Sequence, residues 1–181
     1  MTSISDAKIL IIATDGFEDS ELLKPLKTLK EKGASVTLAS LDSDEIEGAK
    51  GARATPDRTI GDIDADDFDA LLLPGGTKNP DTLRMDEEVV AAIKAFDAAG
   101  KPIAAICHGP WLLAEADIIR GRTVTSWPSI RTDLRNAGAE VVDREVVTDG
   151  HIVTSRKPDD IPAFVEAFIG CVERAEQRAF A

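Results

Sequence analysis

A cysteine and a histidine stand side by side in the stretch AAICHGPWLL, residues 104–113. The run PIAAI before them predicts a buried strand, and Gly109–Ala116 has a short helical pattern. A side chain at such a strand-to-helix turn is exposed as a nucleophile, and the positive end of the following helix favours a thiolate. We therefore predict that Cys107 is a nucleophile of lowered pKa and that His108 transfers its proton.

A second turn supplies partners for this chemistry. The apolar run ALLL, residues 70–73, leads directly into Pro74, Gly75 and Gly76, which neither a strand nor a helix interior would favour. Ligands of open α/β sheets bind beyond the carboxyl ends of the strands. We expect Gly75 and Gly76 to lie beside Cys107 there, with the N–H groups of Gly76 and His108 as oxyanion donors.

The other cysteine has no such setting. Cys171 lies in FIGCVERA, inside an expected final helix, and we interpret it as a buried structural residue. With two cysteines far apart and two histidines, the sequence predicts neither a disulfide framework nor a zinc site. We expect no metal and no cofactor.

The elements that must position these residues alternate along the chain. Apolar runs indicate strands at 8–13, 35–40, 70–73 and 102–106, and helical spacing indicates helices at 21–32, 86–99, 109–116 and 161–178. Residues 42–67 predict an acidic excursion with short edge strands, and later strands are expected at 122–125, 140–142, 146–148 and 152–154, the last two as a hairpin. This order predicts an α/β fold: a three-layer, flavodoxin-like α/β/α sandwich with a mostly parallel sheet and a nucleophile elbow, in one domain spanning 1–181.

Charge and length narrow the function classes. The 181 residues carry a formal net charge of -12, which disfavours nucleic acid as a partner because phosphate binding needs clustered Lys and Arg. No apolar stretch approaches the roughly 18 residues of a membrane span, and the first residues lack the layout of a signal peptide. We expect a cytoplasmic protein without a membrane partner.

Four segments together resemble one family. They are DGFEDSELLKPLKTLKEKG, FDALLLPGG, AICHGPWLLAEADIIRGRTVTSWPSIRTDLRNAGAEVVD and DGHIVTSRKPDDIPAF, in that order. They resemble the PfpI-like intracellular peptidases, in the ThiJ/PfpI branch of the class I glutamine amidotransferase-like superfamily. The resemblance implies that Cys107 is the nucleophile, that His108 is its imidazole, and that the carboxyl of Glu18 lies protonated against the sulfur. From the sequence alone, a helix-start acid is the alternative for Glu18.

The same resemblance implies an oligomer. Asp81 occupies the place of an acid that reaches the histidine from a neighbouring subunit, although the segment from Gly76 to Pro80 is one residue longer here. A helix cap is the alternative for Asp81. Trp127 matches an aromatic near the site, or is a packing residue. Arg156 follows a strand and would bind an acidic group of the substrate, or form a structural ion pair.

Several functions remain open at this stage. A glutaminase would need a distal His followed two residues later by Glu, whereas His151 is followed by Ile152 and Val153, so we interpret His151 as an exposed hairpin residue. The favoured function is a cysteine hydrolase acting on a small carbonyl or peptide substrate, because relatives are assigned peptidase, glyoxalase or deglycase activity. The alternatives are a redox-sensing stress protein that oxidises Cys107 and a chaperone-like holdase.

Overall fold

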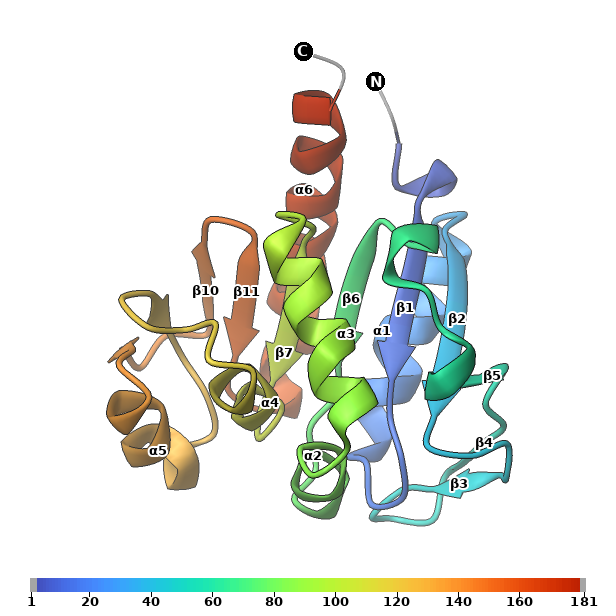
Figure 1. Cartoon of the computed structure of the whole chain (residues 1–181), viewed down its shortest axis with the longest axis horizontal. Helices are drawn as coiled ribbons and strands as arrows, with labels where there is room; N and C mark the ends of the chain where they lie inside the picture. Colours follow the sequence, from blue (N-terminus) through green and yellow to red (C-terminus); the bar gives the residue numbers. More distant parts are fainter. Residues whose placement is uncertain (1–2, 180–181) are drawn as a thin grey trace.

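The computed structural model describes the backbone of residues 3–179 and the side chains of residues 3–175 (Figure 1). Its centre is a seven-stranded sheet in the order β10-β11-β7-β6-β1-β2-β5. Neighbouring strands are parallel except for the antiparallel hairpin β10–β11. The strands are β1 (Lys8–Ile12), β2 (Ser35–Ser40), β5 (Arg58–Thr59), β6 (Ala70–Leu73), β7 (Ile103–Ile106), β10 (Val146–Asp149) and β11 (Ile152–Ser155).

The central strands read as unbroken apolar runs because both of their faces are covered. Every residue of β6 and β7 is buried, and only the first residue of β1 is exposed. A parallel sheet enclosed by helices on both sides has this pattern, in place of the alternation of a half-exposed strand. In the register, Leu72 of β6 lies between Ile11 of β1 and Ala104 of β7.

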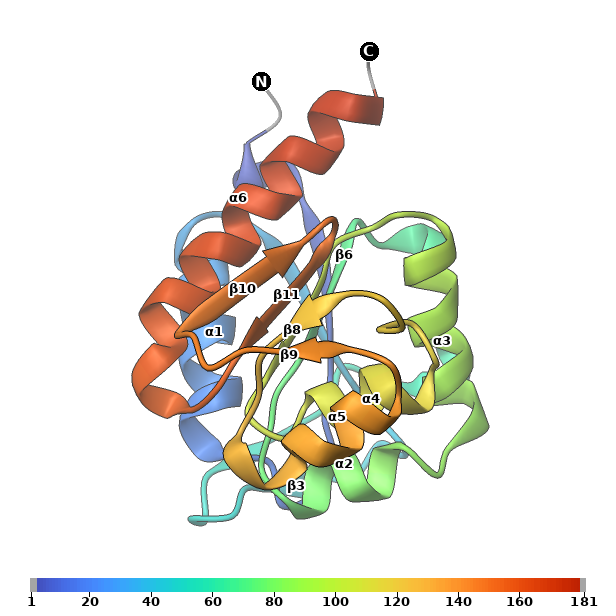
Figure 2. The ribbon, with the colours of Figure 1, turned by 90° about the vertical axis from the view of Figure 1, so that its left-hand side faces the viewer.

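Helices cover both faces of this sheet (Figures 1 and 2). One face carries α1 (Asp19–Glu31) and α6 (Ile161–Ala179), and the other carries α3 (Glu87–Ala98), α4 (Pro110–Glu115) and α5 (Arg131–Asn136), with α2 (Lys78–Leu83) near its lower edge. Each face has its own apolar core, built around Leu29 and Phe164 on the first side and around Ile93, Phe96 and Leu113 on the second. The predicted three-layer α/β fold is confirmed.

The smaller elements differ from the expectation in pairing. The excursion after β2 forms the small antiparallel sheet of β3 (Ile46–Glu47) and β4 (Arg53–Ala54), followed by the edge strand β5. β8 (Thr123–Val124) and β9 (Glu140–Val141) form a separate parallel pair and do not join the main sheet. Neither α2 nor α5 was predicted, because six residues are too few to show a helical period.

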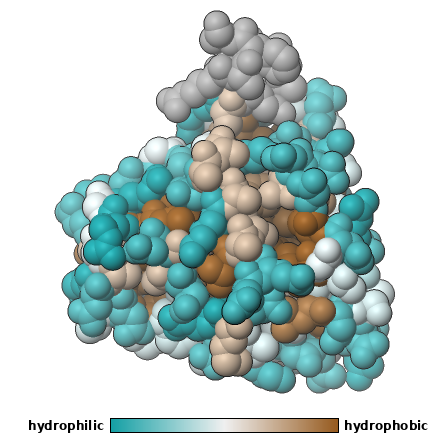
Figure 3. All heavy atoms as spheres, in the orientation of Figure 1, coloured by the Kyte–Doolittle hydropathy of each residue, from teal (hydrophilic) through white to brown (hydrophobic). Residues whose placement is uncertain are grey.

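Hydrophilic residues cover most of the face that carries α3 (Figure 3), in line with the net charge of -12. No helix among the described residues is long and apolar enough to cross a membrane.

The topology brings separate loops to one edge. β11, β7, β6 and β1 are adjacent and parallel, so their carboxyl ends meet at the lower edge in Figure 1. Direct bonds join the turns there: the Cys107 N–H donates to the Ser155 carbonyl at 3.0 Å, and the Glu18 N–H donates to the Gly75 carbonyl at 3.2 Å. A Cβ on Gly75 would lie 2.7 Å from Cys107 Cβ, so the turn after β6, the turn after β7 and the start of α1 form one packed unit.

A substitution at Gly76 tests how tightly these turns are packed. Its φ is +87°, and a Cβ there would lie 2.3 Å from the Gly16 carbonyl oxygen and 2.7 Å from the Glu18 nitrogen. Gly51 has a similar φ of +92° with nothing within 4 Å, so it serves as the matched control. We expect Gly51→Ala to lower the free energy of unfolding by about 1 kcal/mol, and Gly76→Ala by about 3 kcal/mol or more. Urea denaturation measures both, and equal losses would contradict the close packing.

Candidate active site

Cys107 sits at a strained turn between β7 and α4. Its φ is +63°, and among the described residues only one other non-glycine residue, Asp117, has a positive φ. This conformation costs a non-glycine residue about 1–2 kcal/mol. Gly109 permits the sharp turn, because a Cβ there would lie 2.8 Å from the carbonyl oxygens of Ile106 and Leu73. The elbow predicted from the sequence is therefore present, with the cysteine at its apex.

Polar groups from the turn after β6, the elbow after β7 and helix α1 surround the Cys107 sulfur. The backbone N–H groups of Gly76 and His108 point at it, and the carboxyl of Glu21 is within hydrogen-bonding reach. The cysteine is 6% exposed. The two N–H groups are those expected from the sequence as oxyanion donors, so the geometry brings both of them to the sulfur.

Glu21, in the first turns of α1, is completely buried. Its Oε2 accepts a hydrogen bond from the Gly75 N–H at 2.9 Å, while Oε1 has no hydrogen-bond partner among the described residues. Burial, and then the charge of Glu18, raise the pKa of Glu21 to about 8. The carboxyl is therefore largely protonated at neutral pH and can donate a hydrogen bond to the sulfur.

The expected contact between Glu18 and the sulfur is wrong. Glu18 is the N-cap of α1: its Oε2 accepts hydrogen bonds from the Glu21 N–H at 3.0 Å and from the Ser20 hydroxyl at 2.5 Å. Its Oε1 accepts from Lys50 Nζ at 3.3 Å. The helix-start alternative describes this residue, and Glu21, one turn later, takes the place beside the thiol.

The expected lowering of the Cys107 pKa is also not what the structure gives. Burial, followed by the charge of Glu21, raises the pKa of the thiol, and the N–H groups of Gly76 and His108 only partly offset this. The helix terminus and the imidazole favour the thiolate, but burial and the Glu21 carboxyl outweigh them. A negative charge on Glu21 therefore opposes ionisation of Cys107, in addition to the larger effect of burial.

His108 lies between the thiol and a hydroxyl. Its Nδ1 is 3.3 Å from Cys107 Sγ and its Nε2 is 3.2 Å from Ser129 Oγ. Burial lowers the pKa of His108, which keeps the ring neutral at pH 7 and able to accept a proton. Ser129 was not singled out from the sequence. It lies in the short 3-10 helix Pro128–Ile130, and a lone serine there gave no signal.

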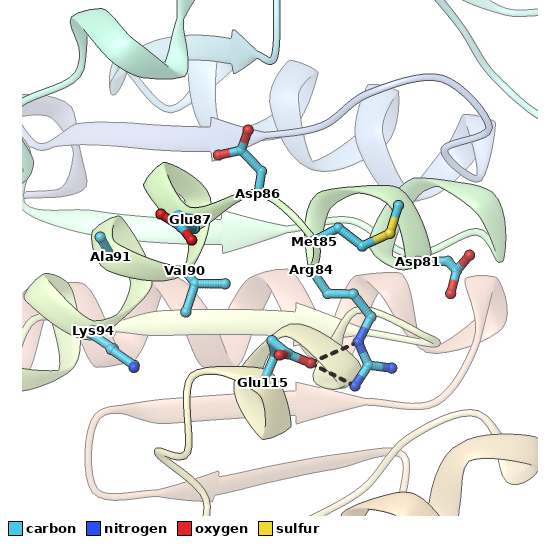
Figure 4. A pocket seen from close by; sticks show the side chains of 9 residues that line it. All are labelled: Asp81, Arg84, Met85, Asp86, Glu87, Val90, Ala91, Lys94 and Glu115. Atoms are coloured by element: carbon cyan, nitrogen blue, oxygen red, sulfur yellow. Dashed lines mark hydrogen bonds and ion pairs between the residues drawn. The ribbon is translucent and has the colours of Figure 1, made fainter.

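Asp81 does not orient His108 within the chain. Among the described residues, no carboxylate is hydrogen-bonded to either ring nitrogen of His108. Asp81 is exposed on α2 and lines a cavity of about 780 Å³ together with Arg84, Met85 and Glu115 (Figure 4). Its contact with a histidine of a neighbouring subunit remains a prediction.

Trp127 and Arg156 have different surroundings. Trp127 is 38% exposed and stacks on His108 with ring centroids 6.0 Å apart and an interplanar angle of 24°, so an aromatic does lie at the site. Arg156 is held by Asp160 at 2.8 and 3.1 Å and by Asp143 at 3.0 Å. Its guanidinium is occupied by protein carboxylates, which corrects the substrate-binding interpretation in favour of the structural ion pair.

The second histidine, His151, and the second cysteine, Cys171, lie away from the elbow. His151 is not an exposed hairpin residue: it is partly buried, and its Nε2 lies 2.7 Å from Asp97 Oδ1, on the last turn of α3. Cys171 is buried in α6, as expected, with its sulfur 3.9 Å from the Gly150 carbonyl oxygen. Within the described part of the chain, no group of three or more His, Cys, Asp and Glu residues could hold a metal ion.

Glu21 could have been found from helix phase. The buried positions of α1 are Glu21, Leu22, Pro25 and Leu29, so the carboxyl occupies a place on the apolar stripe. An acid at a core position of an amphipathic helix indicates a buried and functional carboxyl. The motif GFED drew attention to Glu18 instead.

Fold and site together define an α/β protein with a cysteine at a strand-to-helix elbow, beside a histidine and a buried carboxyl. The model of the DJ-1/PfpI family matches residues 7–170, and the chain belongs to this family.

Individual relatives agree with this assignment. The chain is 46% identical over 162 residues to "Deglycase TK1284" of Thermococcus kodakarensis, covering 90% of this chain and 97% of that protein. It is 46% identical over 170 residues to "General stress protein 18" of Bacillus subtilis, covering 92% and 98%. The crystal structure of an Anabaena variabilis protein with dj-1/thij/pfpi-like and ferritin-like domains aligns with a TM-score of 0.89 and 34% identity. It covers 91% of this chain and 48% of that one.

The raised pKa of Glu21 predicts how stability depends on pH. The folded-state value of about 8 exceeds the ordinary 4.5, so between these values the folded state holds the proton more tightly than the unfolded state. The free energy of unfolding should therefore fall as pH rises through this window, by at most about 1.4 kcal/mol per pH unit. Glu21→Gln stays neutral and should remove the fall.

Urea denaturation at several pH values, with and without Glu21→Gln in a Cys107→Ser background, measures the difference. The background removes the second titrating group of the pair. Parallel stability profiles for the protein that keeps Glu21 and for the Glu21→Gln variant would show that this carboxyl titrates normally.

Proposed function

We propose that this protein is a cysteine-dependent enzyme of the PfpI type that acts on small carbonyl compounds as a glyoxalase or deglycase. The observation that carries the proposal is the elbow thiol, with Nδ1 of His108 3.3 Å from its sulfur and the N–H groups of Gly76 and His108 directed at it. The name deglycase of the relative from Thermococcus kodakarensis supports the same reaction class.

The neutral imidazole is the base in this proposal. We assign the Nε2–H as the donor to Ser129 Oγ and Nδ1 as the acceptor of the Cys107 proton, a tautomer that satisfies both contacts of the ring. As the thiol loses its proton, the protonated carboxyl of Glu21 donates a hydrogen bond to the sulfur. A Glu21 carboxylate would instead repel the thiolate.

The thiolate then attacks a carbonyl carbon. With a 2-oxoaldehyde such as methylglyoxal, the sulfur bonds to the aldehyde carbon, and the oxygen, held by the N–H groups of Gly76 and His108, takes a proton to give a hemithioacetal. His108 moves a proton from that carbon to its neighbour, which leaves a thioester, and water releases the 2-hydroxy acid and the thiol. In an adduct of methylglyoxal with an amine, the former aldehyde carbon is bonded to nitrogen. The carbon–nitrogen bond then breaks as the carbon–sulfur bond forms, and the amine leaves with a proton. One water is the only co-reactant, because oxidation of one carbon balances reduction of the other.

Burial favours a small substrate over a peptide. Cys107 is only 6% exposed, and the indole of Trp127 lies beside His108, so a short carbonyl compound would reach the sulfur more easily than an extended backbone. Peptidase activity is the second candidate within the same chemistry, on the resemblance to PfpI-like peptidases. In the described part of the chain Cys107 and Cys171 are not joined in a disulfide, which fits our proposal of a cytoplasmic enzyme.

Replacing the nucleophile tests the proposal directly. We expect the wild-type protein to convert methylglyoxal and its amine adducts, Cys107→Ala to lose at least about 1,000-fold in kcat/KM, and Cys171→Ser to retain full activity. Product 2-hydroxy acid and released amine are quantified by chromatography, with a fluorogenic peptide panel in parallel. Cleavage of peptides alone would move the function to peptidase. Undiminished turnover by Cys107→Ala would refute cysteine catalysis.

We also propose that the active form is a homo-oligomer in which Asp81 of one subunit reaches His108 of another. Within the chain, Nε2 of His108 meets only the neutral hydroxyl of Ser129 among the described residues, and Asp81 is exposed beside Met85, whose side chain is 77% exposed. A carboxylate on the ring would stabilise the imidazolium that forms during catalysis.

Dilution tests the assembly. We expect light scattering to show at least a dimer, and activity to fall as the oligomer dissociates while circular dichroism stays native. Asp81→Asn should lower kcat without changing the oligomeric state, because it removes only the charge. A fully active monomer would contradict the proposal and leave Asp81 as a surface residue of α2.

A further inference from the structure

Both tryptophans of the sequence contact one imidazole. The ring of Trp127 stacks on His108 at 6.0 Å, and the ring of Trp111, on the first turns of α4, lies 5.4 Å from it at an interplanar angle of 59°. Among the described residues, the hydrogen-bonding partners of the His108 ring are the Cys107 sulfur and the hydroxyl of Ser129. Two weak polar contacts leave the plane of the ring to be fixed largely by the two indoles.

Trp111 is itself held from two sides. Its Nε1–H donates to Asp133 Oδ2 on α5 at 2.8 Å, and the guanidinium carbon of Arg84 lies 5.4 Å from its ring centroid. Arg84 follows the last residue of α2, so three helices converge on this indole. A guanidinium at this distance over an indole is attracted to the face of the ring.

Arg84 is held in turn by Glu115 at the end of α4. Its Nε and Nη2 donate to Glu115 Oε2 at 3.0 and 2.9 Å, on the wall of the cavity shown in Figure 4. Two donors on one oxygen fix the plane of the guanidinium more firmly than a single contact would. The contacts thus run without a break from Glu115 through Arg84 and Trp111 to His108.

We propose that Arg84 is a positioning residue for His108 and acts through Trp111. The inference rests on the proposed function only in assuming that His108 transfers protons in the reaction; the placement of the ring itself can be measured without any substrate. Arg84 touches neither the thiol nor the imidazole in the described contacts, so in this proposal its effect on the reaction passes through the orientation of the ring.

Arg84→Met tests this, because it keeps an unbranched apolar side chain and removes the cation. We expect the imidazole resonances of His108 to shift in nuclear magnetic resonance spectra. The ring currents of the two indoles change these chemical shifts by an amount that depends on how the imidazole is oriented relative to each indole. His151, the only other histidine, pairs with Asp97 at the far end of α3 and should not shift. We expect kcat to fall about 10-fold with KM unchanged, and Arg84→Lys, which keeps a cation over the indole, to recover part of both signals.

Arg120→Met is the matched control, because Arg120 pairs with Asp117 just after α4 and contacts neither tryptophan. It should leave both readouts unchanged. Unshifted His108 resonances in Arg84→Met, or equal shifts in Arg120→Met, would overturn the proposal. A fully active His108→Ala protein would instead overturn the proposed function, while shifted resonances in Arg84→Met would still support the positioning of the ring.

Discussion

The site depends on one constraint: a carboxyl and a thiol share a buried space that has no room for a further carbon atom. A Cβ on Gly75 would lie 2.3 Å from Glu21 Oε2 and 2.7 Å from Cys107 Cβ, so the close approach exists only because that residue is glycine. The turns that follow the adjacent strands β6 and β7 meet here with the helix α1, which follows β1. The strained φ of Cys107 is tolerated because the loops around it are hydrogen-bonded to one another.

Two acids in such a space cannot both be ionised at low cost. Burial places Glu21 near a pKa of 8 and raises the pKa of Cys107, so at neutral pH both protons are largely bound. Attack on a carbonyl then requires a base, and the neutral His108 ring, 3.3 Å from the sulfur, is placed to act as one. In this account the thiol loses its proton to the imidazole only when the reaction begins, and the protonated carboxyl donates a hydrogen bond to the sulfur.

The fold could be predicted because its signals are local: short apolar runs end in turns such as Gly75-Gly76 and alternate with helical periods. Cys107, His108 and Gly76 could be predicted because ends of parallel strands meet at one edge. Ser129 could not, because its contact depends on a loop that returns to the site after 21 residues. Glu21 could be found only from its position on the buried stripe of α1, which no motif marks. The ion pairs of Arg156 with Asp143 and Asp160 likewise depend on how the chain packs, and no motif in the sequence reveals them.

The pH dependence of Cys107 alkylation by iodoacetamide, in a Cys171→Ser background, tests the central claim most directly. Alkylation of an ordinary thiol accelerates with pH as the thiolate forms. If Glu21 must be protonated for Cys107 to ionise, the rate should level off as pH passes about 8, and Glu21→Gln should restore the continued rise. Superimposable profiles for the two proteins, both rising like an ordinary thiol, would contradict the coupling of the carboxyl and the sulfur.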